Sequence, residues 1–168
     1  MVGTLHTNMG VEAGLNRLGI ELVRTDIGDH NVIRCMCDAG IMLGGEQSGH
    51  IILGDFLPTG DGVAAGAALA LAMRRSGLPL SVLDDCKAYP QKNADILTPK
   101  KERIVRDRAL RAYADAVEDM LGASGRVMIR ASGTEPKIRV MAESKDPFLA
   151  DFAARSIELF IRTNYELI

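Results

Sequence analysis

Short apolar runs alternate with helically spaced apolar residues through the first 76 positions, and this alternation constrains the fold more than any other feature of the chain. Residues 2–6 predict a strand, and residues 20–23 predict another. Between them Val11, Leu15 and Leu18 recur at the spacing of one helical face. A strand, a helix and a further strand in succession indicate an α/β layout.

The same pattern continues after the second strand. Asp29 is a candidate N-cap for a helix over residues 29–39, which Gly40 would end. Residues 41–43 and 51–53 predict two strands on either side of a glycine-rich turn. We therefore expect an α/β domain with a mixed sheet.

An alanine-rich segment over residues 63–73 follows this turn region. It is about half the length that a bilayer span needs, and it ends at Arg74 and Arg75. These features predict a packed helix, so we expect no membrane partner. The N-terminus lacks the features of a secretory signal, and three cysteines form no disulfide framework, which predicts a cytoplasmic protein.

The pattern changes where Gly and Pro interrupt it at residues 76–79. We therefore predict an α/β domain over residues 1–78, incomplete at its N-terminal side, and a second domain over residues 79–168. In the second domain, residues 89–97 predict a strand and residues 101–121 predict one long amphipathic helix.

The sequence of the C-terminal part of the second domain predicts a β-hairpin followed by a helix. Residues 126–130 and 137–143 are the expected strands of the hairpin. The last helix begins after Asp146, and its expected inner face consists of Phe148, Phe152, Ile157 and Ile161. The second domain is thus predicted to be α+β, with helices over an antiparallel sheet.

Composition excludes some partners. The net charge of −2 and the 4% of aromatic residues, without tryptophan, are unlike a nucleic-acid-binding surface, so we expect no nucleic-acid partner. Cys35 and Cys37 lie two positions apart in a predicted helix and should point to different sides, which argues against a metal or redox pair. The charged residues 100–108 read as a solvated helix start.

The first cluster of chemically useful residues has the sequence GGEQSGH at residues 44–50. Glycines allow the backbone to turn, and Glu46, Ser48 and His50 offer a carboxylate, a hydroxyl and an imidazole. Such groups can hold adjacent hydroxyls of a sugar. A solvated polar turn is the alternative interpretation.

The second cluster has the sequence RASGTEPK at residues 130–137, between the two hairpin strands. Backbone N–H groups of a glycine-containing turn can surround an anion, and an arginine can bind phosphate in a bidentate way. The candidate phosphate ligands are Arg130, Ser132, Gly133, Thr134 and Arg139, the last expected on the same face as Lys137. A turn that needs Gly and Ser only for its geometry is the alternative.

Together the motifs at residues 45–50 and 130–136 resemble those of the α-D-phosphohexomutase family, most closely its phosphoglucosamine mutase branch. The resemblance extends to residues 4–10, 19–25, 59–62 and 139–141, in the order of the family and across nearly the whole chain. It implies the third and fourth domains of that family. Two separate motifs in register are far more specific than either alone.

The resemblance implies a hexosamine phosphate substrate and specific roles. Glu46 and Ser48 would hold sugar hydroxyls, and His50 would support the loop. Arg130, Ser132, Gly133 and Thr134 would bind the phosphate that is not transferred. The family reaction interconverts glucosamine 6-phosphate and glucosamine 1-phosphate through a phosphoserine, with Mg²⁺ balancing charge at the transferring phosphate. The sequence leaves open whether glucosamine, glucose or mannose phosphate is preferred, although Gln47 leans toward the amino sugar by resemblance.

Two catalytic elements of the family have no counterpart in these residues: the phosphoserine loop and the Asp-Gly-Asp-x-Asp-Arg metal loop. We therefore expect no catalytic residue and no metal ligand in this chain, and no turnover by the chain alone. His30 and Asn31 stand where the family usually has Arg-Tyr. Three interpretations stay open: a C-terminal portion working with an N-terminal half, a stand-alone sugar-phosphate-binding module, and a truncated remnant.

Overall fold

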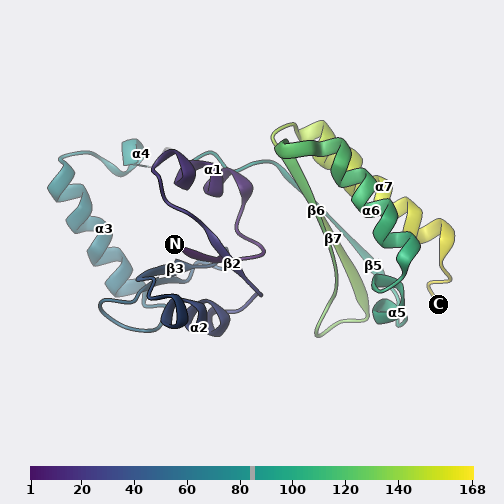
Figure 1. The fold of residues 1–168 in the computed structure, drawn as a ribbon, viewed down its shortest axis with the longest axis horizontal. Coiled ribbons are helices and arrows are strands. Elements are labelled where there is room, and N and C mark those ends of the chain that lie inside the picture. The colour runs from purple at the N-terminus through teal and green to yellow at the C-terminus, as the bar shows by residue number, and fades with distance from the viewer. Residues whose placement is uncertain (84–85) are drawn as a thin grey trace. The chain divides into compact units, whose positions relative to one another are not determined.

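The computed structural model describes residues 1–83 and 86–168. Contacts divide the chain into two compact units, Met1–Ala88 and Tyr89–Ile168, each of which can be followed in Figure 1. The division predicted after residue 78 falls inside the first unit. The segment beyond it stays with that unit, where the Cys86 thiol donates a hydrogen bond to the Gly10 carbonyl at 3.4 Å.

The first unit contains a four-stranded sheet. Its strands are β1 (Val2–Thr4), β2 (Val23–Thr25), β3 (Leu43–Gly45) and β4 (Ile51–Leu53), in the order β2-β1-β3-β4. Strand β1 runs parallel to β2 and β3, whereas β3 and β4 are antiparallel. The predicted mixed α/β sheet is confirmed.

Two strands of this sheet lie slightly later in the sequence than predicted. Strand β2 begins at Val23, and β3 begins at Leu43. Their positions follow from pairing with β1, because Val2 lies opposite Val23 on one side and Gly44 on the other. The register between strands, which local hydrophobicity does not contain, therefore sets these bounds.

The helices that the structure describes in the first unit are α1 (Met9–Arg17), α2 (Asp29–Ala39), α3 (Gly62–Ser76) and α4 (Leu80–Leu83). The Asp61 side chain caps α3 by accepting a hydrogen bond from the Ala64 N–H at 2.8 Å. Asp29 was predicted to cap α2, but the N-cap is Gly28 and Asp29 is the first helical residue. Its carboxylate accepts the His30 N–H at 2.8 Å instead.

The core of the first unit is small and lies between α2 and the sheet. Its buried residues are Val2, Val32, Met36 and Ile52. Helix α2 packs so closely that a Cβ on Gly44 would come within 2.3 Å of the Met36 sulfur. Helix α3, which was predicted to be a packed helix, contacts β4, but none of its residues is fully buried within this unit.

The second unit is a three-stranded antiparallel sheet with helices. Strands β5 (Gln91–Leu97), β6 (Gly125–Ala131) and β7 (Lys137–Ser144) have the order β5-β7-β6. The helices are α5 (Lys101–Val105), α6 (Arg108–Leu121) and α7 (Pro147–Asn164), and the short η1 (Gly122–Ser124) precedes β6. Figure 1 shows α6 and α7 side by side along this sheet, so the predicted α+β architecture is confirmed.

The long helix predicted over residues 101–121 is two helices. Asp107 interrupts it, because its side chain accepts a hydrogen bond from the Ala109 N–H at 2.8 Å and starts α6 as an N-cap. Hydrogen bonds from the Ala109 backbone and the Tyr165 side chain lower the pKa of the Asp107 carboxyl. A polar side chain that accepts hydrogen bonds from backbone N–H groups thus interrupts the helix that the spacing of apolar residues predicted.

The inner face of α7 was predicted only in part. Ile157 and Ile161 are fully buried, as predicted, but Phe148 and Phe152 are 83% and 50% exposed. Alanines replace the phenylalanines on the face that meets the core, at positions 150, 153 and 154. Small residues here allow the helix to lie close to the sheet, and Phe160 stacks on Tyr113 with ring centroids 4.3 Å apart.

None of the helices in residues 1–83 and 86–168 is both long and apolar enough to cross a membrane.

Candidate functional site

The turn between β3 and β4 brings the three predicted sugar-binding residues together. The Glu46 N–H donates to the His50 carbonyl at 3.0 Å, and the Gly49 N–H donates to the Glu46 carbonyl at 3.0 Å. Gly49 has a φ of 100°, which favours glycine. The hairpin geometry therefore places residues 46, 48 and 50 on one short, closed turn.

The His50 ring links the other two side chains of this turn. Its Nδ1 lies 2.9 Å from the Ser48 hydroxyl and 3.0 Å from a Glu46 carboxylate oxygen. On its other side the ring packs against Gly60, where an added Cβ would lie 2.9 Å from the His50 Cδ2. His50 thus connects the turn to the segment before α3 and orients Glu46 and Ser48, which suits the supporting role predicted for it.

The predicted phosphate-binding arginines lie opposite each other on two adjacent strands. Arg130 of β6 is the cross-strand partner of Arg139 of β7, and Asp95 of β5 lies on the other side of Arg139. These three residues project from the face of the sheet opposite the helices, since Ile96 and Ile138 on the alternate positions belong to the core. Burial lowers the pKa of the Arg130 guanidinium, and the nearby Arg139 charge lowers it further.

Arg130 and Arg139 differ in their partners. Arg139 donates to a Glu135 carboxylate oxygen at 2.8 Å. Arg130 forms no hydrogen bond or ion pair with any residue that the structure describes. Two guanidinium groups placed opposite each other repel, so this position is favourable for an anion between them.

The turn after Arg130 has backbone donors to offer. Ser132 is buried, its N–H donates to the Lys137 carbonyl at 2.9 Å, and its hydroxyl accepts the Glu135 N–H at 3.3 Å. Gly133 and Thr134 are exposed, and within the described residues their N–H groups have no acceptor. The turn therefore presents two consecutive N–H groups to solvent beside Arg130, which has no partner in the described part of the chain.

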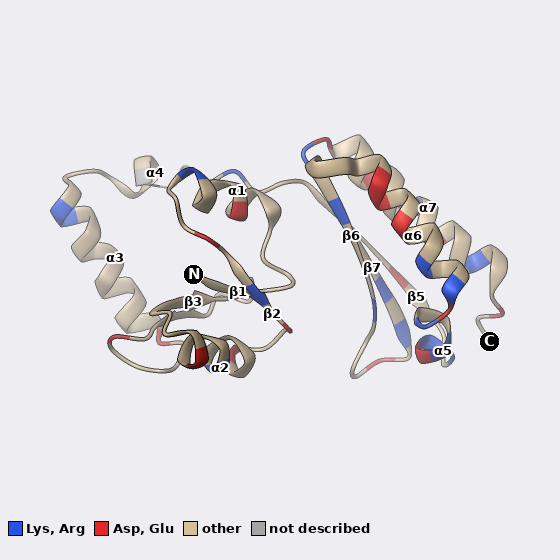
Figure 2. Cartoon of the chain, viewed as in Figure 1, with Lys and Arg blue, Asp and Glu red and all other residues tan. Residues whose placement is uncertain are grey.

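Charges around this turn are arranged as a network. Lys137 lies 2.7 Å from an Asp95 carboxylate oxygen and 2.9 Å from a Glu135 oxygen. The hydrogen bond from Lys137 lowers the pKa of Glu135, and that from Arg139 lowers it further, whereas the hydrogen bonds to Asp95 and Glu135 raise the pKa of Lys137. Figure 2 shows the basic residues along β6 and β7 and the acidic colour of the turn between them.

The sequence motifs missed Lys101. It was predicted to belong to a solvated helix start, but its ammonium donates hydrogen bonds to the Ser132 carbonyl and, at 3.0 Å, to the Glu135 carbonyl. These two carbonyls bracket the turn. No local signal could have identified the contact, because Lys101 and Ser132 are 31 positions apart.

The described residues contain no group of three or more His, Cys, Asp or Glu side chains that could hold a metal ion. We assign no metal ligand among these residues. Cys35 is half-buried and Cys37 is exposed, and both are free thiols. His30 and Asn31 lie where the sequence differs from the usual Arg-Tyr of the family. The Asn31 side chain donates to the Ile27 carbonyl at 3.0 Å, and the His30 ring lies over Gly28.

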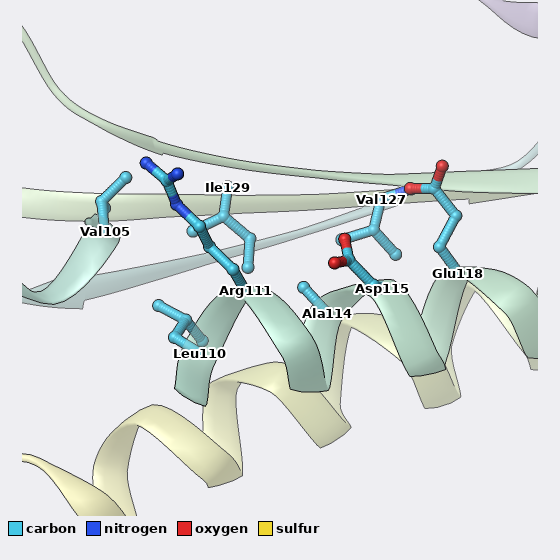
Figure 3. Close-up of a pocket in the computed structure, with 8 residues that line it drawn as sticks. All are labelled: Val105, Leu110, Arg111, Ala114, Asp115, Glu118, Val127 and Ile129. Carbon is cyan, nitrogen blue, oxygen red and sulfur yellow. The ribbon is translucent and has the colours of Figure 1, made fainter. Parts of the chain in front are cut away.

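A separate cavity of about 230 Å³ lies between α6 and β6. Figure 3 shows Arg111, Asp115 and Glu118 of α6 reaching toward Val127 and Ile129 of the strand. Glu118 accepts the Val127 N–H at 2.8 Å and so satisfies an edge-strand donor. Val127 and Ile129 pack on the core side of the sheet, so this cavity and the Arg130 face are on opposite sides.

Both units match models of one family. The model of phosphoglucomutase/phosphomannomutase alpha/beta/alpha domain III matches residues 1–89, which is more than half of the 168-residue chain. The model of the C-terminal domain of the same family matches residues 87–155. The chain therefore belongs to the phosphoglucomutase/phosphomannomutase family and corresponds to its domain III and C-terminal domain.

Relatives within this family include phosphoglucosamine mutases. The phosphoglucosamine mutase of Janthinobacterium sp. (strain Marseille) is 41% identical over 157 residues, which cover 93% of this chain and 35% of that protein. That of Methylorubrum populi is 44% identical over 147 residues, which cover 87% of this chain and 33% of that protein. The chain spans about a third of the length of these curated relatives.

Solved structures show the same fold. Aspergillus fumigatus N-acetylphosphoglucosamine mutase superposes with a TM-score of 0.81 at 18% identity, over 96% of this chain and 38% of that chain. A structure of the same fungal enzyme in complex with GlcNAc-6P and magnesium gives a TM-score of 0.78 at 18% identity, over 96% of this chain and 39% of that chain.

Proposed function

We propose that this chain supplies the sugar-binding turn and the distal phosphate-binding turn of a phosphoglucosamine mutase. In this proposal Glu46 and Ser48 bind sugar hydroxyls while His50 orients them. Arg130, Arg139 and the turn formed by Ser132, Gly133 and Thr134 bind the phosphate that is not transferred. The whole enzyme would interconvert glucosamine 6-phosphate and glucosamine 1-phosphate, so the substrate is a hexosamine phosphate.

One observation carries this proposal: Arg130 has no partner among the described residues, faces Arg139, and adjoins two unpaired backbone N–H groups. A phosphate dianion satisfies all three needs at once. Its oxygens accept several charge-assisted hydrogen bonds, and its negative charge removes the repulsion between the arginines. A neutral ligand would leave that repulsion in place.

The geometry also suits a reaction in which the substrate turns over between two half-reactions. Arginines and backbone N–H groups recognise a phosphate by its charge and oxygens, whichever sugar carbon carries it. The turn can therefore hold the bisphosphate intermediate in either orientation. Carboxylate and hydroxyl groups on a short turn can likewise accept different pairs of adjacent hydroxyls.

The chemical step is assigned to residues outside this sequence. In this proposal the phosphoserine loop and the metal loop belong to an N-terminal part of the enzyme, and Mg²⁺ would balance charge at the transferring phosphate there. Residues 1–168 then contribute substrate binding and orientation, and by themselves show no turnover. A coupled mutase assay of the 168-residue chain that gave the rate of an intact enzyme would contradict this division.

Titration of the ¹⁵N-labelled chain with inorganic phosphate tests the binding site. We expect a dissociation constant of about 1 mM, which corresponds to about 4 kcal/mol and suits a few charge-assisted hydrogen bonds at a solvated site. Amide shifts should concentrate at residues 132–134. If the shifts instead cluster near residues 100–108 while the turn stays unchanged, the turn is not the phosphate site.

A further inference from the structure

A lysine outside both motifs contacts the phosphate-binding turn from behind. Lys101 is the first residue of α5, and its half-buried side chain donates to the carbonyls of Ser132 and Glu135, one at each end of the turn. We infer that Lys101 is a positioning residue for phosphate binding: it fixes the turn so that the Gly133 N–H faces the anion. This inference rests on the proposed function of the turn.

The direction of the Gly133 N–H follows from the geometry of the peptide bond. The described residues contain no cis peptide bond, so the carbonyl of Ser132 and the N–H of Gly133 point in opposite directions across their trans peptide bond. Because the Ser132 oxygen points at the Lys101 ammonium, the Gly133 N–H points away from it. The Glu135 carbonyl belongs to the peptide bond with Pro136, which has no N–H. The hydrogen bond from Lys101 at this end of the turn therefore leaves no N–H group pointing away from the anion.

The same contact strengthens the donor. The positively charged Lys101 ammonium, bound to the Ser132 oxygen, polarises that peptide unit. Hydrogen bonds in a chain reinforce one another. The Gly133 N–H therefore carries more positive charge than a free amide. Without Lys101 the exposed Gly133 would also gain backbone freedom, because glycine is the residue with the fewest conformational restrictions.

The neighbouring lysine provides a matched control. Lys100 lies one position earlier, carries the same charge, and contacts Glu166 at 3.4 Å near the C-terminus. It makes no described contact with the turn. A general loss of positive charge would therefore affect both lysine variants alike, whereas a positioning role belongs to Lys101 alone.

The experiment compares K101M, K101R and K100M with the unaltered 168-residue chain by ¹⁵N NMR titration with inorganic phosphate. We expect K101M to weaken binding about tenfold, as the loss of a charged hydrogen-bond partner suggests. K101R should recover most of the affinity, and K100M should stay within about twofold because its charge is solvated. The thermal midpoints of K101M and K100M should be similar, which separates positioning from a loss of folding.

A second measurement needs no variant. In the uniformly ¹³C,¹⁵N-labelled chain, scalar couplings across hydrogen bonds should connect the Lys101 ammonium nitrogen with the Ser132 and Glu135 carbonyl carbons. Absence of both couplings would overturn the inference, as would a K101M variant that binds phosphate as tightly as the unaltered chain. If the unaltered chain itself shows no phosphate shifts at residues 132–134, the proposed function fails, and this inference fails with it.

Discussion

Replacement of Arg130 by methionine should change stability and phosphate binding in opposite directions. Methionine keeps an apolar stem at this half-buried position but removes the charge opposite Arg139. Relief of a like-charge cross-strand pair is worth about 0.5 kcal/mol. For a domain of this size that gain raises the midpoint of thermal unfolding by about 2 to 4 °C in the absence of phosphate.

Phosphate should reverse this order. At a concentration ten times the dissociation constant, a ligand that binds only the folded state stabilises it by about 1.4 kcal/mol. Loss of one charge-assisted contact of about 2 kcal/mol weakens binding about thirtyfold, so the variant gains only about 0.2 kcal/mol at the same concentration. The Arg130→Met variant should then be about 0.7 kcal/mol less stable than the unaltered chain, on the same account.

Thermal unfolding with and without phosphate, at matched ionic strength, measures both effects. Arg155→Met is the control, since Arg155 is an exposed arginine of α7 that pairs with Asp151 away from the turn. Its stability relative to the unaltered chain should be the same in both buffers. If Arg130→Met is destabilised without phosphate, the repulsion argument is wrong. If phosphate stabilises it as much as the unaltered chain, Arg130 is not a phosphate ligand.

Three other predictions follow from the structure. The ion pairs of Glu135 lower the pKa of its carboxyl, so the stabilising effect of Glu135 is present above the unfolded-state pKa and is lost as pH falls through the folded-state pKa. Glu135→Gln should therefore destabilise the chain at pH 7 but not at the acid end of a series of thermal unfolding measurements. An equal loss of stability at all pH values would contradict this. Ile157→Ala should destabilise the second unit by about 3 kcal/mol in chemical denaturation, whereas Phe148→Ser should stay within about 0.5 kcal/mol; the reverse order would contradict the burial of Ile157 and the exposure of Phe148. Glu46→Ala should leave the affinity for inorganic phosphate within about twofold by NMR titration, because a sugar-hydroxyl ligand has no role in binding phosphate alone, and a larger loss would refute its separate role.

Sequence alone predicted the type of most elements and proposed both clusters of candidate site residues. The α/β and α+β patterns were confirmed because hydrophobic periodicity reports which local structure can bury an apolar face. The turn at residues 44–50 was also predictable as a unit, since Glu46, Ser48 and His50 are close in sequence and a hairpin turn must bring them together. Their role in sugar binding stays a prediction.

Tertiary structure decided what depends on contacts between distant residues. The buried face of α7 uses alanines rather than Phe148 and Phe152, because the space between helix and sheet admits small side chains there. The pairing of Arg130 with Arg139 required the strand register, and the anchoring of the turn required Lys101 to approach it from another element. Periodicity describes one segment at a time, whereas register and packing depend on the partner segment, so only the folded chain determines them.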